Sequence, residues 1–257
     1  MDAAKQRAMD QFGATAEYYV ASTSHRAGDD LPRMLELAAP VCTDRLLDIA
    51  TGGGNVARVF APHVSEVVAS DLTPRMLAAA AGSFSALGLT NVRMAEADAE
   101  DLPFPDASFE IVTCRIAPHH FPNPDRFVTE AARVLRPDGR FVLVDSTVPE
   151  GAAGAFFNRF ELLRDPSHVR SLTVETWLEL IQSAGMPVES VETFTKRHDF
   201  DGWTSRSRMT DDDRAILERM MLDAEEAIQR QFAAEVVDGK LVGFSDTKTL
   251  FVARRLA

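Results

Sequence analysis

Between about residues 45 and 145, short apolar runs alternate with segments whose apolar residues recur at helical spacing. The apolar runs have the length of ordinary strands and are rich in Val, Ile and Leu. This alternation is expected of βαβ units that build a parallel sheet. The strands predicted in this way are Arg45–Ile49, Glu66–Asp71, Asn91–Ala97, Phe109–Cys114 and Gly139–Asp145.

Two helices between these strands have clear boundary signals. Thr73 is predicted as an N-cap, Pro74 suits the first helical position, and Gly88 ends the helix after Leu87. A second helix is expected from about Pro124 to Leu135, because its apolar residues recur on one face.

The flanking segments complete an α/β fold. Residues 1–39 read as an N-terminal helical cap on a main domain spanning 40–257. Beyond the predicted sheet, helices are expected at about 150–163, 173–184 and 211–235, the last with Thr210 as N-cap, and strands at about 188–197 and 247–254. If those two strands pair antiparallel at the sheet edge, residues 199–246 form a substrate-side helical insertion. The fold class expected is therefore Rossmann-like: a doubly wound, seven-stranded sheet, mostly parallel, with an antiparallel last strand.

The composition of the chain limits the classes of partner and location that are expected. The chain has 257 residues and a net charge of −12, so a basic footprint for nucleic acid is not expected. Only two cysteines are present, no apolar leader begins the chain, and no apolar run is long enough to span a membrane. A cytoplasmic protein with a small-molecule substrate is expected, as a monomer or homodimer.

The chemistry-bearing segment follows the first strand, from Asp48 to Asn55. Glycines there allow a tight turn and close approach of a ligand to the backbone. Asp71 ends the second strand, where a carboxylate can accept both hydroxyls of an adenosine ribose. Because Gly52 and Gly54 also fit a dinucleotide fingerprint, a nicotinamide cofactor stays open at this point.

Three further segments are more specific: Asp98-Ala99, the run from Asp101 to Glu110, and the run from Leu135 to Phe141. With these, residues of about 40–150 resemble the class I methyltransferases that depend on S-adenosylmethionine (SAM), in particular the small-molecule group around ubiquinone and menaquinone biosynthesis. In the glycine loop, Ala50 takes the place of the first glycine of the usual pattern.

The resemblance implies where SAM binds. It implies that Asp48, Gly52 and Gly54 line the methionine end, that Asp71 holds the ribose, and that Leu72 and Met76 pack near the adenine. It places Asp98 beside the adenine amino group. We count Ala50, Ala99 and Arg115 with the cofactor site, Arg115 as a support for the pocket.

Candidate catalytic residues follow the fourth and fifth strands. His119 and His120 lie close to the expected methyl position, and a histidine can accept the proton that an acceptor loses. Either could instead cap the strand. Asp145 could face the substrate, or cap the following helix.

Other residues are candidates for contact with the substrate or for a lid over the pocket. Tyr18, Tyr19 and His25 could close over the cofactor, although packing is the alternative. Arg164 and His168 could contact substrate, but with Asp165 they fall short of a metal-ligand set, so no metal is expected.

Three functions remain in competition. The leading one is methyl transfer from SAM to a carbon, oxygen or nitrogen of a small molecule, which releases S-adenosylhomocysteine. A non-catalytic SAM-binding module is the second. A nicotinamide-dependent oxidoreductase is disfavoured, because no Tyr-x-x-x-Lys pair follows the fourth strand.

Overall fold

The computed structural model describes residues 2–21, 30–207 and 209–256. Its strands form one sheet in the order β3-β2-β1-β4-β5-β8-β6, and a short β7 pairs with β8. The pairs from β3 to β5 are parallel, whereas β8 runs antiparallel to both β5 and β6. The strands are β1 (Arg45–Ile49), β2 (Glu66–Asp71), β3 (Val92–Glu96), β4 (Phe109–Arg115), β5 (Leu135–Thr147), β6 (Val188–Asp199), β7 (Glu235–Val237) and β8 (Lys240–Arg254).

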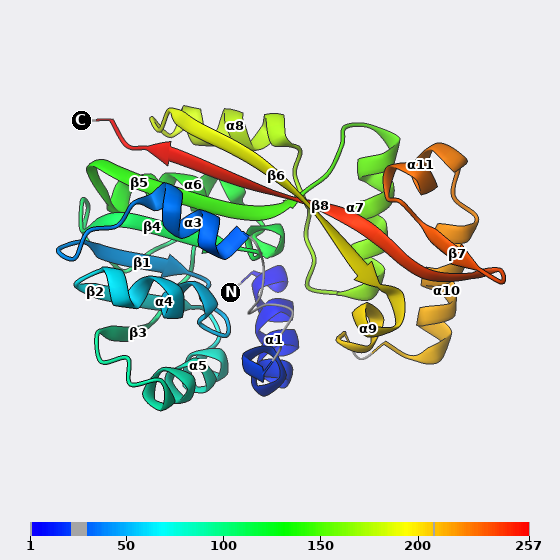
Figure 1. The fold of residues 1–257 in the computed structure, drawn as a ribbon, viewed down its shortest axis with the longest axis horizontal. Coiled ribbons are helices and arrows are strands. Elements are labelled where there is room, and N and C mark those ends of the chain that lie inside the picture. The colour runs from blue at the N-terminus through cyan, green and yellow to red at the C-terminus, as the bar shows by residue number, and fades with distance from the viewer. Residues whose placement is uncertain (1, 22–29, 208, 257) are drawn as a thin grey trace.

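Helices cover both faces of the sheet (Figure 1). Side chains alternate along each strand, so Leu46 joins the core under α3, α4 and α5 while Leu47 joins the core under α6 and α8. The helices are α1 (Ala3–Ala21), α3 (Asp30–Ala38), α4 (Asn55–Phe60), α5 (Pro74–Ala86), α6 (Pro124–Val134), α7 (Ala152–Arg164), α8 (Val174–Ser183), α9 (Phe200–Ser205), α10 (Asp211–Leu222) and α11 (Glu226–Gln231), with 3₁₀ turns η1 (Ala61–His63) and η2 (Pro118–His120).

The doubly wound, mainly parallel sheet confirms the predicted fold class, with two differences in detail. The sheet has eight strands rather than seven, because β7 adds a short antiparallel strand. The helix expected over 211–235 is divided into α10 and α11, and the chain then enters β7. β8 begins at Lys240 and not near 247, so the strand takes in the end of the expected insertion.

A second lobe is built where β6 and β8 extend beyond the parallel strands (Figure 1). There α7, α9, α10 and α11 pack around a separate core that is rich in aromatic rings. Phe160 stacks on Trp203 with ring centroids 5.2 Å apart, and Phe244 meets both rings edge-on. The strands β6 and β8 run without interruption from the main sheet into this lobe.

Helix α1 packs beside α5 and reaches η2, at the edge of the sheet where the parallel strands end (Figure 1). A Cβ at Gly13 of α1 would make ordinary contacts with Thr73 and Arg75 at 3.7 and 3.8 Å, so this part of α1 lies close to the start of α5. Among the described residues, no helix has the length and apolar character needed to cross a membrane.

Candidate cofactor and substrate pocket

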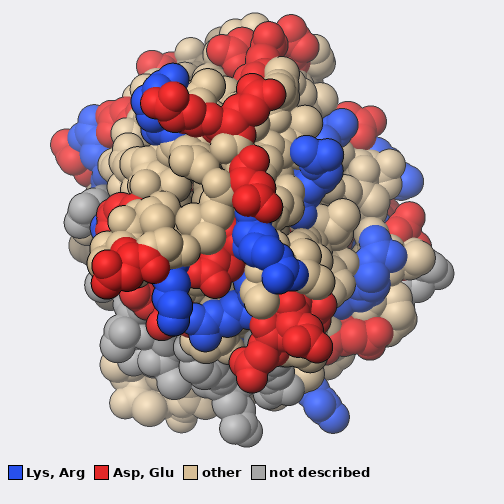
Figure 2. Space-filling model, turned by 90° about the vertical axis from the view of Figure 1, so that its right-hand side faces the viewer, with Lys and Arg blue, Asp and Glu red and all other residues tan. Residues whose placement is uncertain are grey.

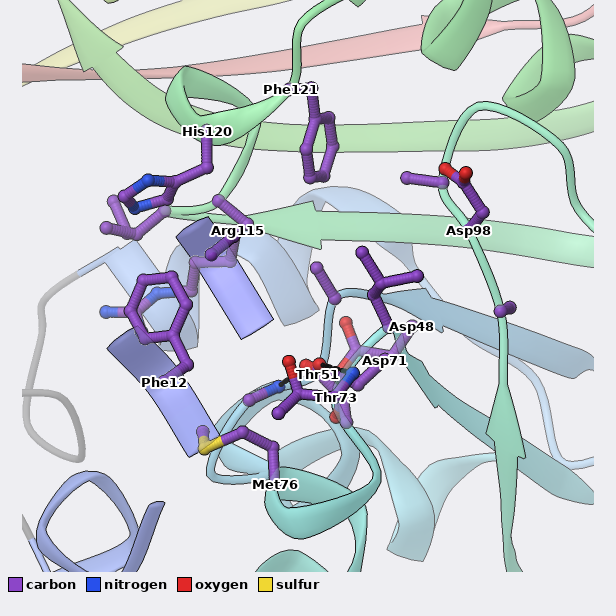
Figure 3. Close-up of a pocket in the computed structure, with 18 of the residues that line it drawn as sticks. Phe12, Asp48, Thr51, Asp71, Thr73, Met76, Asp98, Arg115, His120 and Phe121 are labelled. Atoms are coloured by element: carbon purple, nitrogen blue, oxygen red, sulfur yellow. Dashed lines mark hydrogen bonds between the residues drawn. The ribbon is translucent and has the colours of Figure 1, made fainter. Parts of the chain in front are cut away.

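A pocket opens at the carboxyl ends of β1, β2 and β4, the crevice where doubly wound sheets bind ligands (Figure 3). The chain reverses its strand order here, since β2 and β4 flank β1 on opposite sides. With the exception of Gly54, the residues expected to bind the cofactor all line this pocket: Asp48, Ala50, Gly52, Asp71, Leu72, Met76, Asp98, Ala99 and Arg115.

The two glycines expected to bind the cofactor have different surroundings. Both have positive φ, +53° at Gly52 and +76° at Gly54. Gly52 lines the pocket, and a Cβ there would sit 3.6 Å from the Met76 methyl carbon. Gly54 is not among the pocket residues, because it faces α5: a Cβ would lie 2.3 Å from the ring of Phe84. At Gly54 the absence of a side chain allows close packing between the loop and α5.

Two buried carboxylates hold the glycine loop. Asp48 accepts hydrogen bonds from the hydroxyls of Thr51 at 2.6 Å and Thr113 at 2.8 Å. Burial raises the pKa of Asp48 to about 6, although these hydrogen bonds lower it. Asp71 accepts from the backbone N–H of Gly52 at 3.0 Å and of Thr73 at 2.8 Å. Burial raises the pKa of Asp71 as well.

Asp71 lies directly before the start of α5, and the predicted N-cap position of Thr73 is confirmed. Thr73 occupies the N-cap position of α5, but its side chain makes no capping hydrogen bond. Each Asp71 oxygen accepts one backbone N–H, and the Thr73 side chain also hydrogen-bonds to this carboxylate. A carboxylate anchored in this way is already oriented before a ligand arrives.

Lys5 of α1 lines the pocket and forms ion pairs with two carboxylates. Its ammonium group lies 2.6 Å from Asp98 and 2.7 Å from Glu100. Burial lowers the pKa of Lys5, but the hydrogen bonds to these two carboxylates outweigh burial and leave the pKa raised. Glu100 also accepts from the backbone and side-chain N–H groups of Asn123, so it joins α1 to the start of α6.

Arg115 forms a side wall of the pocket and is paired with Asp30, the first residue of α3. Its Nε lies 2.5 Å and one terminal nitrogen 3.0 Å from the two carboxylate oxygens. Both side chains are about nine-tenths buried. This fork-like pair orients the guanidinium group at the wall of the pocket.

The adjacent residues His119 and His120 of η2 lie in different environments. His119 is buried, and its Nδ1 lies 2.6 Å from Oδ1 of Asp145. Burial lowers the pKa of His119 well below its ordinary value and raises the pKa of Asp145 to about 7. Neither residue lines the pocket, whereas His120 does, with its ring edge-on to Phe12 at 4.9 Å.

Comparison with known proteins identifies the family. The family description "Methyltransferase domain" matches residues 47–143. The uncharacterized methyltransferase YcgJ of Bacillus subtilis is 38% identical over 196 residues, which cover 76% of this chain and 78% of YcgJ. The chain belongs to the class I SAM-dependent methyltransferases. Its cofactor is therefore SAM, and the nicotinamide-dependent alternative is excluded.

Solved structures agree with this methyltransferase fold. BH2331 of Bacillus halodurans, described as a methyltransferase candidate, is 39% identical with a TM-score of 0.87, and covers 90% of this chain and 100% of its own. A demethylmenaquinone methyltransferase of Thermus thermophilus is 39% identical over 128 residues, 49% of this methyltransferase and 58% of the relative.

The remaining predicted site residues of the methyltransferase lie away from the pocket or outside the described residues. Arg164 pairs with Glu161 at 2.7 Å and covers the ring of Trp203 at 4.6 Å. His168 contacts Asn158 at 2.9 Å, and burial lowers the pKa of His168 to about 3. Tyr18 and Tyr19 lie on α1 with side chains outside the described part, as does all of His25.

Several pocket residues of the methyltransferase carry no sequence motif. Lys5, Ala8 and Phe12 project from one face of α1 at helical spacing. That spacing could have marked the face of the helix, but no local signal shows which surface the face would cover. Phe121 and Thr51 also line the pocket, next to residues that the sequence predicts for the site.

Proposed function

We propose that this methyltransferase transfers the methyl group of SAM to a small-molecule acceptor and releases S-adenosylhomocysteine. The observation that carries the proposal is that His120 and Phe12 line the same pocket as the glycine loop and Asp71. One cavity thus offers a cofactor cradle, an apolar wall and a group able to accept a proton.

The residues present fit SAM. Asp71 lines the pocket with a carboxylate that could accept from a ribose hydroxyl, and the bare backbone at Gly52 leaves room for close approach. Leu72 and Met76 supply an apolar surface for the adenine, and Asp98 would accept from its amino group. When bound, SAM supplies a methyl group on a positively charged sulfur, which an incoming nucleophile can attack.

The chain's own contribution is to position the acceptor and exclude water. Phe12 and Phe121 give the pocket aromatic walls, and α1 closes one side of it. His120 would take the proton of an acceptor with an ionisable hydroxyl, amine or acidic carbon. The relatives named demethylmenaquinone methyltransferases are consistent with an acceptor that has an aromatic body.

The surface supports a small acceptor rather than nucleic acid. Figure 2 shows one face of the molecule, where Lys and Arg side chains are interspersed with Asp and Glu and form no continuous basic stripe. The whole chain carries a net charge of −12. Phosphate backbones bind to clustered cations, so this balance of charge disfavours them.

The test follows the methyl group from radiolabelled SAM. Purified protein is incubated with labelled SAM and a cell extract, which is then separated into low-molecular-mass, protein and nucleic-acid fractions. We expect label in the low-molecular-mass fraction, a large loss in His120→Gln, and no loss in the control His63→Gln, which changes an exposed histidine. Label that accumulates in RNA or protein would refute a small acceptor, and absence of S-adenosylhomocysteine binding by calorimetry would refute the site.

A further inference from the structure

We propose that the segment from Asp165 to Ser167 fixes the protonation of His120, so that its Nε2 is the proton acceptor of the pocket. The inference rests on the proposed function, since it names the groups that prepare His120 for that reaction. Its geometry lies outside the cofactor site, in the turn that follows α7.

Two oxygen atoms of Ser167 face Nδ1 of His120. The backbone carbonyl oxygen lies 3.1 Å away and the hydroxyl Oγ lies 3.2 Å away. A carbonyl oxygen only accepts hydrogen bonds. Nδ1 must therefore carry a hydrogen to satisfy the carbonyl.

The hydrogen bonds of the Ser167 hydroxyl also indicate that Nδ1 carries a hydrogen. Its Oγ lies 2.5 Å from Oδ1 of Asp165, and a serine hydroxyl has a single hydrogen to give. That hydrogen goes to the carboxylate, so Oγ presents a lone pair to Nδ1. Both Ser167 oxygens are then acceptors, and a neutral imidazole with hydrogen on Nδ1 has its free lone pair on Nε2.

Asp165 is buried, yet its surroundings keep it charged. Burial raises the pKa of Asp165, but the charges of His120 and Arg164 and the hydrogen bonds from Ser167 outweigh burial, and the pKa is lowered. The backbone N–H of Ser167 also donates to Oδ1 at 2.9 Å. The charged carboxylate is thus placed to accept the hydroxyl hydrogen of Ser167.

The turn is held firmly against the histidines. The backbone N–H groups of Val169 and Arg170 both donate to the carbonyl oxygen of His119, at 2.9 and 3.0 Å. Asp165 itself ends α7, where its N–H donates to the Glu161 carbonyl. This clamp sets the position of Ser167 relative to η2, as precise proton transfer requires.

The other ring nitrogen of His120 is available to a ligand. Within the described part of the chain, Nε2 has no hydrogen-bond partner, and the ring lines the pocket beside Phe12 (Figure 3). His119 differs, because its Nδ1 meets a buried carboxylate and its ring does not reach the pocket. The pair is therefore not interchangeable.

This arrangement favours an acceptor whose nucleophilic atom carries a removable proton, such as a phenolic or enolic hydroxyl. As the acceptor oxygen bonds to the methyl carbon, its proton moves to Nε2, and the electron pair of the broken sulfur–carbon bond stays on sulfur. The products are the methylated acceptor, S-adenosylhomocysteine and a protonated His120, which returns its proton to solvent. A tertiary amine would gain nothing from this base.

The test reads the ring nitrogens directly. Long-range proton–nitrogen spectra of the full chain labelled with ¹⁵N-histidine are recorded at about pH 8, where an ordinary imidazole is neutral. The His120 signals are assigned as those lost in His120→Gln. We expect hydrogen on Nδ1 and a bare Nε2; a majority form with hydrogen on Nε2 in the wild-type protein overturns the proposal, whatever the variants do.

Variants separate the two Ser167 contacts. Asp165→Asn should shift the population towards hydrogen on Nε2, because the serine hydroxyl loses its charged acceptor. Ser167→Ala should keep the wild-type form, since the carbonyl remains. Asp223→Asn is the matched control, an exposed aspartate at the C-cap of α10, and should change nothing.

Calorimetry with S-adenosylhomocysteine on the same samples keeps the two proposals apart. We expect Asp165→Asn to bind within about threefold of wild type, since Asp165 does not line the pocket. If the wild-type protein fails to bind this nucleoside while the spectra show hydrogen on Nδ1, the proposed function fails and the assignment of the ring stands. A wild-type population in Asp165→Asn would overturn the role of the carboxylate.

Discussion

Gly52 and Gly54 stand two positions apart in one loop, and the structure predicts that alanine at each will damage a different property. Both residues have positive φ, so a Cβ at either position costs about 1–2 kcal/mol of conformational strain. The difference lies in what the added methyl group meets. At Gly52 the nearest atom is the Met76 methyl carbon at 3.6 Å, an ordinary contact, whereas at Gly54 the Phe84 ring is 2.3 Å away.

The expected magnitudes follow from these surroundings. Phe84 is almost completely buried, so its ring must displace neighbours, and overpacking of a core costs about 1–3 kcal/mol. Gly54→Ala should therefore lower the free energy of unfolding by about 2–5 kcal/mol, the sum of strain and overpacking. Gly52→Ala should lose only about 1–2 kcal/mol of stability from strain, but its methyl group enters the cofactor pocket and should weaken S-adenosylhomocysteine binding about tenfold or more.

Urea unfolding and calorimetry on the same samples give the two quantities. Gly54→Ala combined with Phe84→Leu should recover part of the lost stability, because the smaller side chain leaves space. Gly82→Ala on α5 is the control: nothing lies within 4 Å of its added Cβ, so stability should rise by about 0.5–1 kcal/mol. Equal effects of Gly52→Ala and Gly54→Ala on stability and affinity would refute the division of roles.

Three further predictions test the carboxylates around the pocket. Asp71→Asn leaves one oxygen to serve both the loop and the ribose, so binding of S-adenosylhomocysteine should weaken by about 1.5–3 kcal/mol in calorimetry, and unchanged affinity would exclude a ribose contact. Lys5→Met leaves buried Glu100 without its cation and should lower the free energy of unfolding by about 1–3 kcal/mol in urea; no loss would mean that the ion pair contributes nothing. Asp145 has a raised pKa, so the folded state holds its proton and loses stability as pH rises from about 4 to 7, the window between the unfolded and folded pKa values. Asp145→Asn removes this loss, so its melting temperature should gain on wild type between pH 5 and pH 8, and a constant difference would contradict the raised pKa.

Local sequence signals were sufficient for the parallel half of the fold. The bounds of β1 and β2 match the predicted strands residue for residue, since both are short apolar runs with turn residues nearby. The helix expected over 211–235 shows where such signals end. Its composition favours continuous helix, but the Gln229 side chain donates to the carbonyl oxygens of Met221, Leu222 and Ala224 and caps α10 there. Propensity cannot anticipate a cap supplied by a side chain that folds back.

The cofactor side of the pocket was foreseeable because its residues follow one another along two strand ends. Asp48, Gly52 and Asp71 all lie within one βαβ unit, so spacing alone brings them together. Lys5 meets Asp98 across 93 positions of sequence, and only the docking of α1 creates that pair. Sequence patterns cannot predict such a contact, because no residue close to Lys5 in the sequence indicates its partner.

The two histidines show why adjacent candidates needed the structure to be told apart. They occupy successive positions of a 3₁₀ turn, in which side chains project about 120° apart because each turn takes three residues. Adjacency therefore guarantees different surroundings: when His119 turns inward to Asp145, His120 must face elsewhere, and it reaches the pocket. Asp145, near the end of β5, thus affects the pocket indirectly, because it binds His119 on the side away from the pocket. Replacing His119 should consequently disturb the orientation of His120 without removing a group from the pocket.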